Sequence, residues 1–359
     1  MEGAWGQYGR LGGELLARIT GIGTAVPSFR FEQDAIFQVL FADRSTDQRA
    51  RSIFENSAIS TRHAVLPRLE LLLNNPSTRE RNQIYVQEAP CLAMAAARRG
   101  LDQAGLSPRD IDLLVVVSCT GYEIPGLDLA LASALDMRPD LHRTCVLGMG
   151  CYAAFPGLMR ARDAVLAHPA SRALLVAIEL CSLHFQSSNT DEDVVSSSLF
   201  ADGAAAVIVE AQGNLVMVDA ETFTQYHTAE HMAFSLTDHG FKMRLSSYVP
   251  HILTLHIKGF VEGVLARNGI KTSDIRYWGI HPGGRKILDR IQEEFALHDA
   301  QIASSRRVLR DYGNMSSPTI LFVLEDILQQ GTPQVGDHVV LLAFGPGLTM
   351  EVCLLRWEH

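Results

Sequence analysis

Four features are scarce or missing in this 359-residue sequence, and each absence narrows what the protein can be. Positive charge is in deficit: the formal net charge is −9, which disfavours a nucleic-acid partner because phosphates need a basic surface. No apolar run approaches the roughly 20 residues of a membrane-spanning helix, so we expect no membrane partner. The first residues, "MEGAWGQYGRLGGELLARITGIG", lack a basic start followed by an apolar core, and we expect no signal peptide.

Closely spaced cysteines are the fourth absence. The six cysteines form no C-x-x-C pair, and most of them lie within apolar runs. This pattern is typical of free thiols in a reducing cytoplasm, and it predicts neither a disulfide framework nor a metal site. With 47% hydrophobic residues, the chain can bury a core large enough for two domains or one duplicated domain.

Short β-rich apolar runs alternate with helical stretches along the chain. Because continuous apolar strands between helices are typical of sheets covered on both faces, the pattern predicts an α/β fold. The strand-like runs are 112–119, 144–148, 173–180, 204–210, 277–280, 338–344 and 349–355.

An internal echo divides the chain in two. "AGLSPRDIDLLVVVSC" and "NGIKTSDIRYWGIHP" each follow a helix-like run that ends near a glycine, as a left-handed helix cap requires. In both, an Asp-Ile pair follows the glycine and a strand begins. α/β proteins repeat strand–helix units in any case, but the shared order favours two similar halves. We place these halves at 17–215 and 216–359, after an N-terminal arm at 1–16.

The stretch "VLGMGCYAAFPG" holds the first candidate for chemistry. The helix-like run after Cys151 is apolar on nearly all sides, so Cys151 is predicted at the N-terminus of a buried helix. Free N–H groups and the helix dipole favour a thiolate there. Two alternatives stay open on this stretch alone. One is an inert buried thiol; the other is a dinucleotide-binding turn on Gly148, Gly150 and Ala153, with Glu179 as the ribose-binding acid.

Two residues of the second half are candidates to assist that thiol. His281 follows a strand-like run and precedes Pro-Gly-Gly, a place where α/β proteins often carry catalytic groups. A histidine there can move a proton or donate to a carbonyl. Asn314, in "YGNMSS", is a neutral donor that can stabilise an enolate or thioester oxygen. Taken singly, a turn histidine and a helix-capping Asn are the competing interpretations. A pseudo-two-fold fold would bring both beside Cys151.

Five segments together resemble the type III polyketide synthases, the chalcone-synthase-like branch of the thiolase superfamily: "GMGCYAAFPGLMRARD", "FADGAAAVIVE", "GIHPGGRKILDRI", "YGNMSSPTILFVLED" and "LLAFGPGLTMEVCLL". The resemblance implies a thiolase-like five-layer αβαβα fold and a homodimer without bound cofactor. It also implies iterative decarboxylative Claisen condensation of malonyl-CoA onto an acyl-CoA starter, followed by cyclisation to a pyrone or aromatic polyketide. A ketoacyl synthase that performs a single condensation shares the Cys-His-Asn set and is the alternative.

Carried over to this sequence, the resemblance assigns the catalytic roles. Cys151 is the nucleophile that holds the starter and the growing chain. His281 and Asn314 promote decarboxylation of malonyl-CoA and stabilise the resulting enolate, and His281 also helps to keep Cys151 ionised.

The resemblance further implies a substrate cavity. Phe200 matches a gatekeeper aromatic, Met243 stands where plant members usually have a second gatekeeper Phe, and Ile124 matches a position that reaches into the neighbouring subunit. Cys119 and His184 differ from the plant pattern, which favours a bacterial enzyme making pyrones or resorcinol-like rings over one using a phenylpropanoid starter. The expected substrate-binding residues are Cys119, Thr120, Ile124, His184, Phe200, Phe234, Met243, Ser316, Gly345, Pro346 and Gly347.

The expected CoA entrance also differs from the family pattern. Family members hold the phosphates with Lys and Arg, but one usual Lys position is Asn56 here. The expected CoA-binding residues are Arg49, Arg51, Arg62, Arg285 and Lys286.

Overall fold

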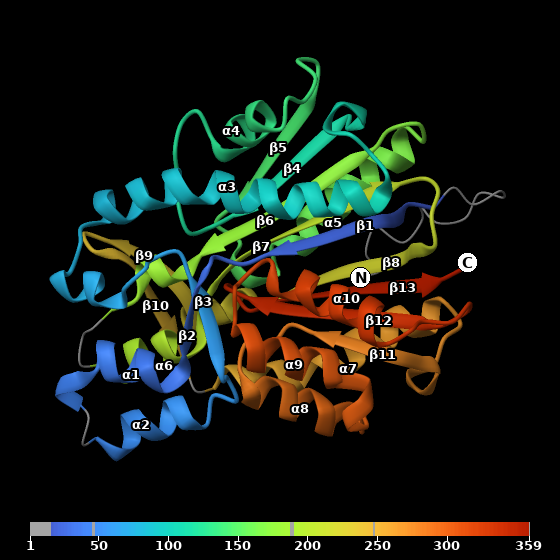
Figure 1. The fold of residues 1–359 in the computed structure, drawn as a ribbon. Helices are drawn as coiled ribbons and strands as arrows, with labels where there is room; N and C mark the ends of the chain where they lie inside the picture. Colours follow the sequence, from blue (N-terminus) through green and yellow to red (C-terminus); the bar gives the residue numbers. More distant parts are fainter. Residues whose placement is uncertain (1–15, 45–46, 187–189, 247, 359) are drawn as a thin grey trace.

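The computed structural model describes residues 16–44, 47–186, 190–246 and 248–358 (Figure 1). The N-terminal arm predicted at 1–16 therefore lies, apart from its last residue, outside the described residues. The large sheet has nine strands: β1 (Arg18–Ala25), β4 (Leu113–Ser118), β5 (His142–Leu147), β6 (Ala173–Leu180), β7 (Asp202–Glu210), β8 (Leu215–Thr224), β11 (Ile275–Ile280), β12 (His338–Gly345) and β13 (Thr349–Trp357).

Two small antiparallel pairs and ten α-helices complete the described elements. The pairs join β2 (Phe29–Glu32) to β3 (Thr61–Ala64) and β9 (Met232–Thr237) to β10 (Gly240–Leu245). The helices are α1 (Gln33–Leu40), α2 (Gln48–Glu55), α3 (Thr78–Ala104), α4 (Leu127–Ala134), α5 (Ala154–Ala167), α6 (Asp191–Leu199), α7 (Val249–Arg267), α8 (Arg285–Phe295), α9 (Ala303–Tyr312) and α10 (Thr319–Gln330).

The large sheet contains the same strand arrangement twice. In the first half β4 pairs in parallel with β6, and β6–β7 and β7–β1 are antiparallel. In the second half β11, β12, β13 and β8 pair in the same order and with the same orientations. The halves join where β1 pairs with β8, at Arg18↔Val216 and Ile19↔Leu215. The prediction of two similar halves is confirmed.

The sequence echo falls at the same place in each half. α3 and α7 both end at a turn in which a glycine, Gly105 or Gly269, has a φ of +68° or +71°. A side chain is strained at such angles, so the two glycines allow each chain to leave its helix. A short 3-10 helix and then β4 or β11 follow in both halves.

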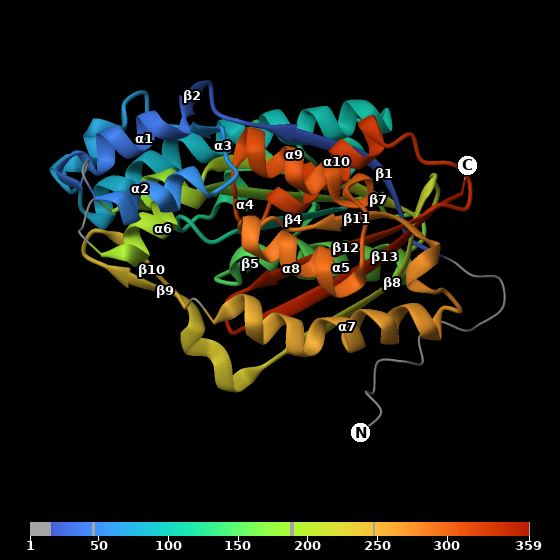
Figure 2. The ribbon, with the colours of Figure 1, turned by 90° about the horizontal axis from the view of Figure 1, so that it is seen from below.

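Helices and strands alternate in five layers (Figures 1 and 2). α3 packs on β1, β6 and β7, and α7 packs on β8 and β13 at the opposite face. Between the halves, α5 contacts β4, β6, β7 and also β13, while α10 contacts β11, β12 and also β1 and β7. This αβαβα order confirms the predicted thiolase-like fold. Fully buried side chains such as Phe155 and Leu321 fill the central layer, each worth about 1.5–3 kcal/mol of burial.

Both central helices begin at one place. A short 3-10 helix, Gly150–Tyr152, precedes α5 and contains Cys151, while Ser316 lies just before α10. The Cys151 thiol hydrogen-bonds with the side chains of Ser316 and Asn314, so the two helix starts are adjacent. The chemistry predicted from the two halves of the sequence therefore meets at the centre of the molecule.

Candidate active site

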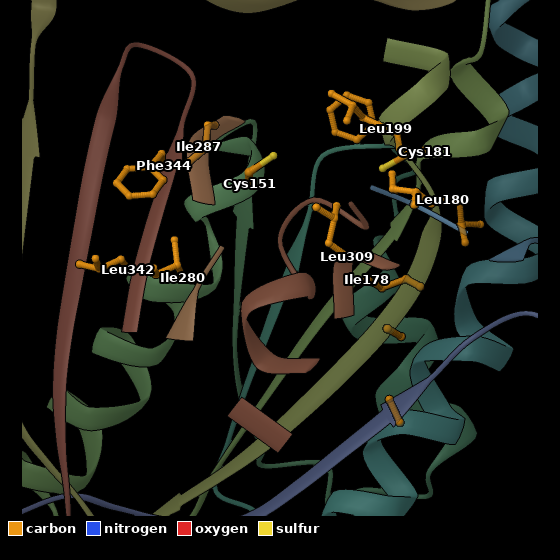
Figure 3. Close-up of a cluster of buried hydrophobic side chains, with 14 of the residues drawn as sticks. Cys151, Ile178, Leu180, Cys181, Leu199, Ile280, Ile287, Leu309, Leu342 and Phe344 are labelled. Carbon is orange, nitrogen blue, oxygen red and sulfur yellow. The ribbon is translucent and has the colours of Figure 1, made fainter. Parts of the chain in front are cut away.

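The turn that carries Cys151 is built on glycines. Gly148 and Gly150 both have a φ of +72°, and a Cβ added to Gly150 would lie 2.8 Å from Pro346 Cδ. Because a side chain would collide with the loop after β12, glycine lets this turn and that loop lie in contact. Cys151 is buried, and Figure 3 shows its side chain directed away from Phe344, towards the side on which Cys181 lies.

The amide of Asn314 is held in one orientation. The backbone N–H of Ser316 donates to Asn314 Oδ1 at 2.8 Å, and Thr319 Oγ1 lies 3.5 Å from the same oxygen. Since the oxygen is engaged by this turn, the NH2 group is the end left to face the Cys151 thiol. A neutral donor beside the sulfur can stabilise a developing oxyanion without adding a titrating group.

His281 follows the last residue of β11. Its backbone N–H donates to the carbonyl of Leu342 at 2.7 Å, which continues the pairing with β12. The side chain is 1% exposed, and among the described residues neither ring nitrogen has a hydrogen-bond partner. Burial lowers the pKa of His281 to about 3, so the ring is neutral, with one donor and one acceptor nitrogen. Both nitrogens are therefore available to a substrate.

The thiol is neutral as well. Burial raises the pKa of Cys151 to about 11, although hydrogen bonds with Ser316 and Asn314 act in the opposite direction. Burial is also the cause of the shift at His281, with no contribution from Cys151. Burial thus favours the uncharged form of each group, because charges are costly when removed from water.

A cavity of about 400 Å³, within the range of small-molecule sites, is lined by Gly150 and Ser316, which are neighbours of Cys151 and Asn314. Cys151, Asn314 and His281 themselves are not among its lining residues. All the predicted substrate-binding residues line it except Ile124 and Gly345. Gly345 instead packs against Tyr152, whose Cδ1 would lie 2.5 Å from an added Cβ. Ile124 is 75% exposed at the surface.

Two aromatic rings and a thioether form one wall of the cavity. Phe234 in β9 pairs with Met243 in β10, and the Phe200 ring meets the Phe234 ring edge-on at 6.0 Å between centroids. All three side chains line the cavity. Phe234 therefore narrows the cavity next to Phe200, the predicted gatekeeper. The flexible side chain of Met243 allows the neighbouring part of the wall to change shape.

His184 lines the cavity, but both of its ring nitrogens are hydrogen-bonded to the backbone of the cavity wall. Nδ1 accepts a hydrogen bond from the backbone N–H of Phe241 at 3.2 Å, so Nε2 carries the proton and donates to the carbonyl of Thr120 at 2.7 Å. Burial lowers the pKa of His184 to about 4. The neutral ring therefore links β10, the second strand of the β9–β10 hairpin, to the segment that follows β4.

Four of the five predicted CoA-binding residues lie at the surface. Arg49 pairs with Asp191, the first residue of α6, at 2.8 Å, and Arg51 pairs with Asp34 at 3.5 Å. Arg285 and Lys286 begin α8 and are exposed. All four could meet a phosphate from solvent.

Arg62 is the exception, and its predicted role in CoA binding is corrected here. Its side chain is 2% exposed, and its guanidinium lies over the rings of Phe54 and Phe185. Nη1 donates to the carbonyl oxygens of Ser197 and Phe200, both at 2.6 Å. A side chain enclosed in this way cannot reach a phosphate at the surface.

Sequence reasoning missed Cys181, which lines the cavity directly after β6, and the true place of Glu179. Glu179 is fully buried in β6 and accepts hydrogen bonds from Cys119 N at 3.0 Å, Thr120 Oγ1 at 2.8 Å and Ser317 Oγ at 2.7 Å. Its carboxyl is thus occupied inside the protein and cannot hold a ribose, so the dinucleotide interpretation is wrong. A charged residue within an otherwise apolar strand was the available signal.

Within the described ranges, no group of three or more His, Cys, Asp or Glu side chains is placed to hold a metal ion. In the same ranges, every helix is too short or too polar to cross a membrane.

Comparison with protein families decides the identity of this site. Residues 10–213 match the N-terminal domain of the chalcone and stilbene synthases, and residues 216–357 match their C-terminal domain. The chain belongs to the chalcone and stilbene synthases.

Several named members of this family are similar over nearly the whole length. The chain is 35% identical to the 1,3,6,8-tetrahydroxynaphthalene synthase of Streptomyces peucetius subsp. caesius, with 94% of this chain and 93% of that protein covered. It is 34% identical to the alpha-pyrone synthesis polyketide synthase-like Pks18 of Mycobacterium tuberculosis, with 94% and 90% covered. Among solved structures, the tetrahydroxynaphthalene synthase of Streptomyces coelicolor A3(2) has a TM-score of 0.90 and 28% identity, with 95% and 99% covered.

These comparisons confirm the family predicted from the five segments. The chalcone and stilbene synthase fold and the relatives make this chain a type III polyketide synthase, an acyltransferase that catalyses iterative Claisen condensation. The single-condensation ketoacyl synthase, kept as the alternative, is not favoured by any of them.

Proposed function

We propose that this type III polyketide synthase loads an acyl group from an acyl-CoA onto Cys151, extends it with malonyl-CoA and cyclises the chain to a pyrone or small aromatic ring. The observation that carries the proposal is a buried Cys151 thiol hydrogen-bonded to the fixed amide of Asn314, next to Gly150 and Ser316, which line a largely apolar cavity. The buried imidazole of His281, without a hydrogen-bond partner among the described residues, is proposed to join them. Relatives named as tetrahydroxynaphthalene and alpha-pyrone synthases support this product class.

In the loading step the Cys151 sulfur attacks the thioester carbonyl of the starter. The thiol proton passes to the acceptor nitrogen of His281, and the Asn314 NH2 group donates to the oxyanion of the tetrahedral intermediate. When the C–S bond to CoA breaks, the proton moves from His281 to the departing CoA sulfur. The acyl group is then a thioester on Cys151. Proton transfer only during attack suits a thiol and an imidazole that are both neutral at rest.

In the extension step malonyl-CoA loses CO2 and leaves an enolate on its thioester. Asn314 and the donor nitrogen of His281 stabilise the enolate oxygen as neutral donors, in a site that excludes water which would protonate the carbanion. The enolate carbon attacks the acyl thioester, a C–C bond forms, and Cys151 leaves as a thiolate that recovers a proton. The lengthened chain, now on CoA, returns to Cys151 for the next round.

Four surface cations, in α2 and at the start of α8, are proposed to hold the CoA phosphates: Arg49, Arg51, Arg285 and Lys286. Their exposure supports this role, since phosphates bind well to accessible Arg and Lys. The cavity of about 400 Å³ and the bulk of Phe234 favour a compact product over one built on a phenylpropanoid starter.

We propose a homodimer in the cytoplasm. Ile124 is 75% exposed, and Tyr122 and Leu147, which line the cavity, are 60% and 49% exposed at the same edge. β5 is the end strand of the sheet, with one side open to pairing. A second copy would cover this face. All six cysteines are free thiols, as in a reducing compartment. The boundary between the halves is placed at 215/216.

The test is incubation with labelled malonyl-CoA and short, long and aromatic acyl-CoA starters, followed by mass spectrometry. We expect CO2 release and a labelled pyrone or ring. Cys151→Ala should fold normally yet form no acyl-enzyme, whereas Cys91→Ala, which changes an exposed thiol, should behave as wild type. Cys151→Gln places a carboxamide where the thioester would be and should still decarboxylate malonyl-CoA. Absence of CO2 and of labelled product with every starter would disprove the proposal.

A further inference from the structure

Arg62 is a buried cation that the reaction above does not use. It lies in β3 at 2% exposure, and within the described residues its Nε and Nη2 have no hydrogen-bond partner. Burial lowers the pKa of Arg62 to about 9, which leaves the side chain charged at neutral pH. Burying a charge is costly, so its contacts are expected to have a specific purpose.

Those contacts are with the end of α6. The last carbonyls of a helix lack donors within the helix and carry the negative end of its dipole. Arg62 Nη1 gives one hydrogen bond to the Ser197 carbonyl and one to the Phe200 carbonyl, both at 2.6 Å. Gln33 Nε2 donates to the intervening Ser198 carbonyl at 2.8 Å. Arg62 and Gln33 thus both donate hydrogen bonds to backbone carbonyls at the C-terminal end of α6.

The same segment pairs with Asn314. The Asn314 backbone N–H donates to the Leu199 carbonyl at 2.9 Å, and the Ala201 N–H donates to the Asn314 carbonyl at 2.9 Å. This isolated bridge between Phe200 and Asn314 is parallel. Phe200 is therefore held from two sides: Arg62 donates to its carbonyl, and its backbone pairs with Asn314, whose amide faces Cys151.

Close packing keeps the guanidinium in this place. A Cβ on Gly313, the residue before Asn314, would lie 2.9 Å from both Cγ and Cδ of Arg62. On the other side, the guanidinium carbon lies 6.0 Å and 5.5 Å from the ring centroids of Phe54 and Phe185, within cation–π range. The stem of Arg62 thus contacts the turn that carries Asn314, while its head group holds the carbonyl of Phe200.

We propose that Arg62 is a positioning residue for the extension step: by fixing 197–201 it holds the Phe200 ring and the Asn314 amide in register with Cys151. This inference rests on the proposed function. Acyl loading depends chiefly on the Cys151 thiol, whereas decarboxylation depends on the Asn314 donor and on the gatekeeper. Loss of the cap therefore affects the two half-reactions unequally.

The experiment compares Arg62→Lys and Arg62→Met with wild type in two assays. Acyl loading of Cys151 is followed by intact mass with a starter CoA, and decarboxylation is followed as CO2 released from malonyl-CoA. For Arg62→Met we expect loading to stay within about twofold, decarboxylation to fall by about tenfold or more, and KM for malonyl-CoA to rise. Arg62→Lys retains a cation for one carbonyl, so it should recover part of the decarboxylation rate.

Gln33→Met is the control, because it removes the hydrogen bond to the neighbouring Ser198 carbonyl of the same helix end, and one to Ser57 Oγ, while the Arg62 hydrogen bond to the Phe200 carbonyl stays. It should leave the ratio of decarboxylation to loading unchanged. If both Arg62 variants lower the two rates by a common factor that follows the folded fraction, the residue is only structural and the inference is wrong. If Arg62→Met does not fold, the ratio of decarboxylation to loading measured for Arg62→Lys tests the inference in its place. Wild-type protein that releases no CO2 would overturn the proposed function and, with it, this role.

Discussion

At the scale of single residues, burial determines the chemistry of this site. Cys151 and His281 are both enclosed, and burial moves the thiol pKa up to about 11 and the imidazole pKa down to about 3. Each shift favours the uncharged form. Burial therefore favours a neutral thiol and a neutral imidazole in the free enzyme.

This state predicts how Cys151 reacts with iodoacetamide in the free enzyme. Only the thiolate is alkylated, and with a pKa of about 11 its fraction rises as pH rises throughout the neutral range. The rate at the Cys151 peptide, followed by mass spectrometry, should increase by about tenfold per pH unit between roughly pH 6 and 9. His281→Ala should leave that profile unchanged. A plateau below pH 7 that disappears in His281→Ala would instead indicate a resting ion pair.

Residues whose role follows from a local motif could be found from sequence, and residues whose role comes from packing could not. Cys151, His281 and Asn314 each lie in a short recognisable segment, and the fold places the Asn314 side chain against the Cys151 thiol. Arg62 has the charge expected of a phosphate ligand, and nothing local says that α6 would end against it. Glu179 was noticed, but its partners come from the segment after β4 and from the start of α10, which only the fold places around it.

At the scale of elements, the β9–β10 hairpin forms the adjustable wall of the cavity. The hydrogen bonds of His184 to the Phe241 N–H and the Thr120 carbonyl hold this hairpin in place. His184→Leu removes two buried hydrogen bonds at similar volume, so we expect a loss of about 2 kcal/mol in the free energy of unfolding. In this variant the hairpin is no longer linked to Thr120, so Phe234 and Met243 should move aside and the enzyme should make longer polyketide chains. Denaturant unfolding and mass spectrometry of the products measure both effects.

The exposed His239 at the tip of the same hairpin supplies the control. His239→Leu should change the unfolding free energy by less than about 0.5 kcal/mol and leave the product pattern unaltered. An unchanged product pattern in His184→Leu would mean that the hairpin is held by other contacts.

β1 shows why one strand could not be found from the sequence. β1, "RITGIGTA", contains glycines that disfavour a strand on propensity. They are needed because α3 crosses the strand closely: a Cβ on Gly21 would lie 2.2 Å from the Gly100 carbonyl oxygen. Strands such as β6, "ALLVAIEL", and β12, "HVVLLAFG", were foreseen because they are continuously apolar and fully covered.

At the scale of the whole molecule, the exposed face around Ile124 predicts the assembly. Ile124→Asp places a charge on that face, so sedimentation velocity should show dimer giving way to monomer, with a dissociation constant raised by about a hundredfold. Val335→Asp is the control, since Val335 is also exposed, at 71%, but lies in the loop before β12. Identical sedimentation of Ile124→Asp and wild type would place the interface elsewhere.

The central layer has a consequence for how the chain comes into being. α10 is synthesised late, yet it covers β1 and β7, and Thr24 Oγ1 donates to Glu325 Oε2 at 2.6 Å. When the ribosome has made the first half, the apolar inner faces of these early strands still lack their cover. The nascent first half therefore cannot complete its core until the last quarter of the chain has been synthesised. A fragment ending at residue 215 should aggregate alone and become soluble only when 216–359 is supplied in the same cell.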